Sequence, residues 1–187
     1  MGKVVTGMRM SLDGFINDRN GRVEPLYPDL ENLKDTELIQ ESIRSTGAVL
    51  MGRNSFDMAG EDYDWGTYEF QVPIFVLTHH PPKSAPQGGA GQTFTFVTNG
   101  VENAIRQAKA AAGDKDVAVI PGASTTNQVL LAGLADELGV EIMPILLGSG
   151  LRPFGAAGLE NIKLERIRIM EMQNGGIDVR YRIINTA

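Results

Sequence analysis

Short apolar segments alternate with helical patterns along most of this chain of 187 residues. The segments are apolar on both faces, as buried strands are, and the stretches between them carry apolar residues at helical spacing. This order is typical of an α/β fold in which helices cover both faces of a mainly parallel sheet. The strands are expected at residues 4–11, 48–51, 73–78, 94–97, 117–120 and 138–147.

Helices are expected between these strands, at residues 30–46, from Asn54, at 101–112 and at 125–134. Asn54 can cap a short helix, because its side-chain oxygen can accept a hydrogen bond from a free main-chain N–H. Thr125 and Gln128 have the spacing of a capping box. The last of the four helices is therefore expected to begin at about Thr125.

The C-terminal part has a different pattern. Apolar and charged residues alternate over residues 162–172 and 177–183, and an Asn-Gly-Gly sequence at 174–176 separates the two runs. This pattern predicts an antiparallel hairpin. The alternation slips between Leu164 and Ile167, which indicates a β-bulge in the first strand.

Composition narrows the classes of function. No linker or repeat divides the sequence, so residues 1–187 are expected to form a single domain. The formal net charge is −6 and the charges are interspersed, which argues against nucleic acid as a partner. No apolar run approaches the roughly 18 residues of a membrane span, and we expect a cytoplasmic protein without a membrane partner. The chain has no cysteine, two histidines and no acidic cluster at metal-ligand spacing, so no metal site is expected.

In a parallel sheet, ligands bind outside the carboxyl ends of the strands. The first loop at such an end is Gly52-Arg53-Asn54-Ser55, where a strand runs into the start of a helix. Free main-chain N–H groups and the guanidinium of Arg53 would both favour a phosphate. The alternative interpretation is an ordinary turn with an arginine on the surface.

A second loop contains Gly122 and Ala123 after the strand at 117–120. Small residues let a ligand approach the main chain closely, and a pyrophosphate over this turn would explain them. A helix cap alone is enough to explain Thr125 and Gln128.

A third loop is Thr78-His79-His80. Neighbouring residues at a strand end point to opposite sides, so at most one imidazole faces a shared ligand such as a ribose phosphate. Two exposed loop histidines are an equally good interpretation. The sequence lacks the glycine-rich fingerprint of the usual dinucleotide-binding fold, and it has neither a Walker loop nor a nucleophile elbow.

Five segments occur in an order and at spacings that are more specific than any one of them: Met10-Ser11-Leu12-Asp13-Gly14-Phe15-Ile16, Met51-Gly52-Arg53-Asn54-Ser55-Phe56, Ile74-Phe75-Val76-Leu77-Thr78, Gly122-Ala123-Ser124, and Pro144-Ile145-Leu146-Leu147-Gly148-Ser149-Gly150 with Pro153-Phe154. Together they resemble the dihydrofolate-reductase-like superfamily. The most similar branch contains the reductase domain of the riboflavin-biosynthesis deaminase-reductases. The resemblance covers nearly the whole chain.

The resemblance implies a dihydrofolate-reductase-like fold with a sheet of eight or nine strands, and NADPH as the cofactor. Residues 53–55 would lie by the adenosine-side phosphates, and residues 78–79 near the 2′-phosphate and adenine. Residues 122–125 would cradle the pyrophosphate, and the main chain around Arg9 and Ile16 would hold the nicotinamide carboxamide. The implied cofactor-binding residues are thus Arg9, Ile16, Gly52, Arg53, Asn54, Ser55, Thr78, His79, Gly122, Ala123, Ser124 and Thr125.

The resemblance also implies that Asp13 lies near the nicotinamide and the substrate. Asp13, or a water that it holds, is the candidate catalytic group for delivering a proton. The sequence departs from the family pattern at Pro121, which replaces the first of two glycines and removes one N–H donor. Dihydrofolate reductases carry an acidic residue early in their first helix, and Asp29 is the candidate for it in this sequence. A role as a helix N-cap explains Asp29 more simply.

The expected activity is hydride transfer from NADPH to a small heterocyclic substrate, most like the reduction of 5-amino-6-(5-phosphoribosylamino)uracil in riboflavin biosynthesis. Reduction of dihydrofolate or another pterin is one alternative. A non-catalytic nucleotide-binding protein with the same cleft is another, and Pro121 supports it mildly. The resemblance implies a homodimer, and the open edge of the hairpin at residues 162–183 invites pairing or covering.

Overall fold

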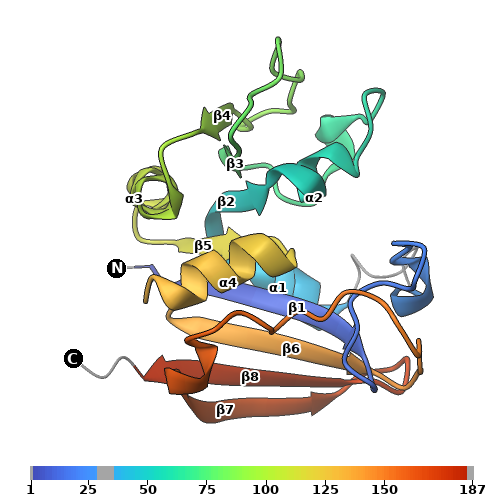
Figure 1. Ribbon diagram of the computed structural model, residues 1–187. Helices are drawn as coiled ribbons and strands as arrows, with labels where there is room; N and C mark the ends of the chain where they lie inside the picture. The colour runs from blue at the N-terminus through green and yellow to red at the C-terminus, as the bar shows by residue number, and fades with distance from the viewer. Residues whose placement is uncertain (1, 29–35, 185–187) are drawn as a thin grey trace.

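The computed structural model describes residues 2–28 and 36–184 of the chain. Its centre is one eight-stranded sheet with the strand order β4-β3-β2-β5-β1-β6-β8-β7 (Figure 1). The strands from β4 to β6 are parallel to their neighbours, whereas β8 is antiparallel to both β6 and β7. The predicted α/β fold, with a mostly parallel sheet and a C-terminal antiparallel hairpin, is confirmed.

The strands are β1 (Val4–Ser11), β2 (Thr46–Gly52), β3 (Ile74–Leu77), β4 (Phe94–Val97), β5 (Asp116–Val119), β6 (Glu137–Met143), β7 (Lys163–Glu171) and β8 (Ile177–Ile184). The α-helices are α1 (Glu37–Ser45), α2 (Arg53–Asp57), α3 (Val101–Ala112) and α4 (Ala123–Leu131). Short 3-10 turns are η1 (Glu24–Leu26), η3 (Trp65–Thr67) and η4 (Leu159–Asn161). Asp29 and the beginning of the helix predicted at 30–46 lie outside the described residues.

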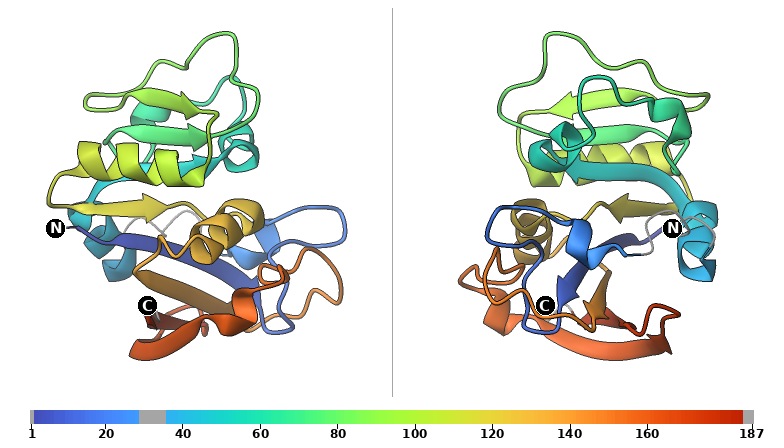
Figure 2. Two further views of the ribbon diagram at one scale, coloured as in Figure 1. Left: turned by 60° about the vertical axis from the view of Figure 1, so that its left-hand side comes forward. Right: turned by 90° about the vertical axis from the view of Figure 1, so that its right-hand side faces the viewer.

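The sheet has an apolar core on each face. Successive residues of a strand point to opposite faces, so Leu50 of β2 packs into the core under α3 and α4, and Met51 packs into the other core. Ile43 of α1 packs against this second core. The helices therefore form layers on both sides of the sheet (Figure 2).

Two differences from the predicted element ends have a plain physical reason. The helix α1 begins at Glu37, because Thr36 has an extended main chain and its hydroxyl accepts a hydrogen bond from the N–H of Ile39. The strand β6 ends at Met143 rather than at residue 147, because Pro144 has no N–H to continue the ladder. The bulge predicted in the hairpin is confirmed by a shift of register between Arg166 and Arg168.

The two expected helix caps are wrong. The helix α2 begins at Arg53 with Gly52 as its N-cap, so Asn54 lies inside the helix. The helix α4 begins at Ala123 rather than at Thr125, and its N-cap is Gly122. In both places a glycine takes the N-cap position: Gly52 is the last residue of β2, and Gly122 follows the end of β5 at Val119 by three residues.

Candidate functional site

The beginnings of α2 and α4 contact each other at the carboxyl edge of the sheet. The hydroxyl of Ser55 donates a hydrogen bond of 3.0 Å to the main-chain carbonyl of Pro121. A Cβ atom on Gly122 would lie 3.1 Å from the hydroxyl oxygen of Ser55. Where the same two helix starts meet, a Cβ atom on Gly52 would lie 2.3 Å from Oγ1 of Thr125. The structure thus brings together the loops at 52–55 and 122–125, which are far apart in the sequence.

Main-chain N–H groups are available where these helices begin. Among the residues that the structure describes, no side chain caps α2 or α4. The first N–H groups of a helix have no partner within the helix, and the helix dipole adds positive potential at this end. The side chain of Gln128, which was expected to complete a capping box, donates instead to the hydroxyl of Ser124 at 3.1 Å. The start of the nine-residue helix α4 is therefore suited to an anion.

Arg53 links the first predicted loop to the third. Its Nε donates to the carboxylate of Asp57 at 2.7 Å, and its Nη1 donates to the carbonyl oxygen of His80. Thr78 is buried, and its hydroxyl bonds to both the N–H and the carbonyl of His80. His79 is exposed beside them. The guanidinium is fixed at this edge of the cleft, although Asp57 offsets part of its charge.

Asp13 joins the loop after β1 to the loop after β6. Its carboxylate accepts hydrogen bonds from the Ser11 hydroxyl at 2.6 Å, the Leu147 N–H at 3.1 Å and the Gly148 N–H at 2.7 Å. The bond from Ser11, with those from the two N–H groups, holds the pKa of the Asp13 carboxyl below its usual value against the opposing effect of desolvation. The group is ionised at neutral pH. It is therefore suited to hold a water or a loop in place rather than to donate a proton itself.

The strand β1 extends beyond its pairing with β5. The strand β5 pairs with β1 only over residues 4–6, whereas β6 pairs with β1 over residues 5–11. Beyond Thr6 the chain of β5 leaves the sheet toward α4, so the second half of β1 lies along a gap between the strands. This gap lies where the resemblance places the nicotinamide.

The two residues predicted at the nicotinamide have other contacts of their own. The side chain of Arg9 is buried, donates to Glu141 at 2.6 Å and lies 4.6 Å from the centroid of the Tyr27 ring. The N–H of Ile16 donates to the carbonyl of Leu151 at 2.9 Å. Any contact of Ile16 with a carboxamide would thus use its carbonyl rather than its N–H.

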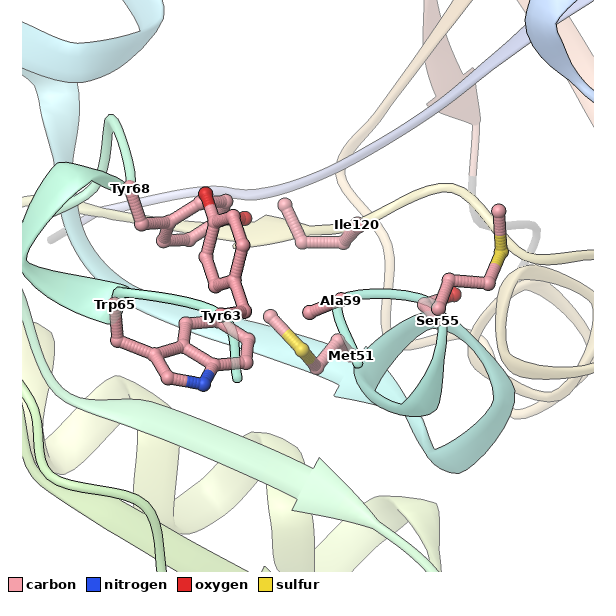
Figure 3. A pocket seen from close by; sticks show the side chains of 8 residues that line it. Met51, Ser55, Ala59, Tyr63, Trp65, Tyr68 and Ile120 are labelled. Atoms are coloured by element: carbon pink, nitrogen blue, oxygen red, sulfur yellow. The ribbon is translucent and has the colours of Figure 1, made fainter. Parts of the chain in front are cut away.

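A pocket of about 240 Å³ opens beside Ser55. In Figure 3 the rings of Tyr63, Trp65 and Tyr68 stand together at one end, and Ser55 lies at the other. The ring centroids of Tyr63 and Tyr68 lie 5.1 Å and 5.4 Å from that of Trp65. The lining residues are Met51, Ser55, Met58, Ala59, Tyr63, Trp65, Tyr68 and Ile120.

The sequence pattern did not predict this pocket. Residues 60–71 read as a polar loop, and only the presence of three aromatic residues within six positions could have indicated a role. The loop is ordered by Asp64, whose carboxylate accepts a hydrogen bond of 2.9 Å from the N–H of Gly66 at the turn η3. Trp65, in that turn, is buried and stacks on Phe56 of α2, with ring centroids 5.4 Å apart.

Neither a membrane-spanning helix nor a metal-ligand cluster occurs in the described residues, 2–28 and 36–184. No helix there is long and apolar enough to cross a membrane. No group of three or more acidic or histidine side chains there is arranged to hold a metal ion.

The sequence profile of the RibD C-terminal domain family matches residues 2–179. The chain belongs to this family. The protein YyaP of Bacillus subtilis (strain 168) is 24% identical over an alignment of 189 positions, which covers 96% of this chain and 94% of YyaP. The predicted relationship to riboflavin-biosynthesis reductase domains is thereby confirmed.

Two solved structures show the same fold. A candidate riboflavin biosynthesis protein from Shewanella sp. PV-4 has a TM-score of 0.75 at 24% identity, over 98% of this chain and 99% of the other. The diaminohydroxyphosphoribosylaminopyrimidine deaminase/5-amino-6-(5-phosphoribosylamino)uracil reductase of Thermotoga maritima has a TM-score of 0.69 at 16% identity. That match covers 98% of this chain and 57% of the bifunctional protein. The RibD C-terminal family is reductase-like, and this chain shares its fold.

Proposed function

We propose that this protein is an NADPH-dependent reductase that delivers hydride to a small heterocyclic substrate in the pocket beside Ser55. One observation carries the proposal: the uncapped start of α4 meets the start of α2 next to an aromatic pocket. A cofactor phosphate and a flat substrate would thus be held side by side. Membership of the RibD C-terminal domain family supports the same assignment.

The residues of the cleft fit a dinucleotide phosphate. Gly52 and Gly122 let the two helix starts approach each other closely, because a Cβ atom on either would meet a hydroxyl of the other helix. The N–H groups at residues 123–125 suit the pyrophosphate, and Arg53, beside Thr78, suits the phosphate at the adenosine end. When bound, the nicotinamide supplies a hydride for a C=N or C=O carbon of the substrate.

The protein's own part is to orient the reactants and exclude water. The gap between β1 and β5 lies beside the loops that Asp13 joins, and the aromatic pocket offers a flat apolar wall. A substrate ring on that wall would be held in one orientation, which favours the transfer through proximity. An ionised Asp13 can orient a water that supplies the proton.

Two substrates are the first to test. One is 5-amino-6-(5-phosphoribosylamino)uracil, the compound in the name of the Thermotoga maritima protein. The other is a dihydropterin, whose flat ring matches the aromatic lining of the pocket. Oxidation of NADPH with either compound supports a reductase.

The proposal is tested first by cofactor binding. A ligand that binds only the folded state at 100 times its Kd raises the free energy of unfolding by about 2.7 kcal/mol, so NADPH should raise the melting temperature. Trp65 is the only tryptophan and lines the pocket, so its emission should change when the cleft fills. We expect Arg53→Gln to weaken the binding of NADPH more than the binding of NADH. The control Arg44→Gln, on the exposed side of α1, should change the binding of neither cofactor. No rise in melting temperature at millimolar NADPH contradicts the proposed function, and binding without any turnover favours the non-catalytic alternative.

A further inference from the structure

The aromatic pocket has no basic group in its lining. Its residues are apolar or aromatic except for the hydroxyls of Ser55, Tyr63 and Tyr68, and it includes no lysine, arginine or histidine. Burial raises the pKa of the Tyr63 and Tyr68 hydroxyls, so both stay protonated at neutral pH. The pocket can thus stack a ring and hydrogen-bond to its edge, but it offers no charge for an anion.

The segment that forms the aromatic end of the pocket is acidic. Residues 60–71 contain four carboxylates and no basic residue, namely Glu61, Asp62, Asp64 and Glu69. The charges of Glu69 and Asp64 add to the effect of burial in raising the pKa of the Tyr63 hydroxyl. Tyr63, Trp65 and Tyr68 belong to this acidic segment, so a ring that stacks on them lies where an anion is disfavoured and a cation is favoured.

Three arginines on the strands, helices and loops that form the candidate site have partners of their own. Arg53 bonds to Asp57, and Arg9 bonds to Glu141, each at a side-chain distance below 3 Å. The guanidinium of Arg152 lies over the Phe15 ring, 4.6 Å from its centroid, beyond the loop that carries Asp13. A phosphate on a ring stacked at the aromatic end would thus lie beside an acidic segment, and these three arginines already have partners.

Resting on the proposed function, we propose that the substrate of this reductase is a planar heterocycle without a phosphate, either neutral or positively charged. Its ring would stack among Tyr63, Trp65 and Tyr68, with the opposite edge directed toward Ser55 and the start of α4 (Figure 3). The pocket thus selects against the phosphoribosyl group that the substrate of the Thermotoga maritima protein carries in its name. The acidic segment, rather than the cofactor loops, sets this preference.

Riboflavin and FMN form a matched pair of probes, because they share one planar ring system and differ by a phosphate. We would measure both dissociation constants by calorimetry on the full chain, without cofactor and with saturating NADP⁺. We expect riboflavin to bind at least about tenfold more tightly than FMN, because like charges at an interface are strongly disfavoured. Tyr63→Leu should raise the dissociation constant for riboflavin several-fold, since it removes one of the stacking rings.

Charge variants test the cause of the preference. The double variant Glu69→Gln, Asp62→Asn should bind FMN more tightly than the wild type does and bind riboflavin equally well. The two dissociation constants should thus come closer together. Glu102→Gln, which removes a carboxylate from α3, is the control and should alter neither. Equal or tighter binding of FMN, a ratio that the double variant leaves unchanged, or failure of both flavins to bind overturns the proposal. The cofactor test is separate, because NADPH that fails to raise the melting temperature contradicts the proposed function whatever the flavins do.

Discussion

Gly52 and Thr125 stand so close that a Cβ atom on Gly52 would lie 2.3 Å from the Thr125 hydroxyl oxygen. Thr125 is 4% exposed, so its buried side chain has little freedom to move away. The contact fixes how near α2 comes to α4. It also explains why the strand β2 ends in a glycine.

We expect Gly52→Ala to lower the free energy of unfolding by about 1–3 kcal/mol, the usual cost of overpacking a filled site. The substitution should also weaken the binding of NADPH, because relief of the clash moves the two helix starts apart. Urea denaturation and cofactor titration measure the two effects. Gly155→Ala is the control, because no atom lies within 4 Å of its added Cβ. Adding Thr125→Ala to the first variant should restore part of the stability, and a Gly52→Ala protein as stable as the wild type contradicts the contact.

The hydrogen bond from Ser55 to Pro121 is the second link between the helices. Ser55→Ala removes a bond whose net contribution is about 1 kcal/mol, so we expect a rise of about fivefold in the Kd for NADPH. The melting temperature should fall by only a few degrees. Ser45→Ala on α1 deletes a similar bond, from a hydroxyl to the Ser42 carbonyl, far from the cleft. If both variants bind NADPH equally well, the Ser55 bond has no part in forming the site.

Asp13 should make the stability of the protein depend on pH. Its pKa is depressed in the folded state, so its contribution is present above the pKa of the unfolded chain and is lost as the pH falls through the folded value. Asp13→Asn should therefore lower the melting temperature at pH 7, and the difference from the wild type should shrink toward about pH 3. Turnover should fall sharply while NADPH still binds, because the loops around the reactants lose their link.

Asn17→Ser is the control for Asp13. The side-chain oxygen of Asn17 accepts a hydrogen bond of 2.8 Å from the N–H of Leu151, and so it joins the same two loops without a titrating group. Its loss of stability should be the same at each pH. A constant difference between wild type and Asp13→Asn across the titration contradicts the role given to the carboxylate.

The sheet could be predicted from the sequence because its strands are apolar on both faces. β1 was predicted at its observed limits, and the slip of alternation near Ile167 located the bulge. The helix starts could not be predicted in the same way. Polar residues at 54 and 125 have the chemistry of caps, but Gly52 and Gly122 take the N-cap positions, and Thr125 is buried inside α4.

The site was predicted only in part for a similar reason. The loops at 52–55 and 122–125 were found because a parallel sheet brings the carboxyl ends of its strands to one edge. The ion pair between Arg53 and Asp57 follows from their spacing, because residues four positions apart are neighbours on the surface of a helix. The aromatic pocket depends on how a loop without periodicity folds over α2, and only the tertiary contacts of Trp65 reveal it.

The last prediction concerns the homodimer that the resemblance implies. β7 is an edge strand of the sheet, but its bulge and charged side chains oppose pairing of its main chain with another strand. One face of the hairpin is apolar and exposed, with Ile169 at 57%, Leu164 at 44% and Ile177 at 39%. We therefore expect this face, rather than the edge, to meet a second copy.

Ile169→Lys should convert a dimer to a monomer in light scattering with little change in melting temperature, whereas Leu131→Lys, at an exposed site on α4, should leave the dimer intact. A wild-type protein that is monomeric at high micromolar concentration shows the homodimer prediction to be wrong, and a dimer that resists Ile169→Lys places the interface elsewhere.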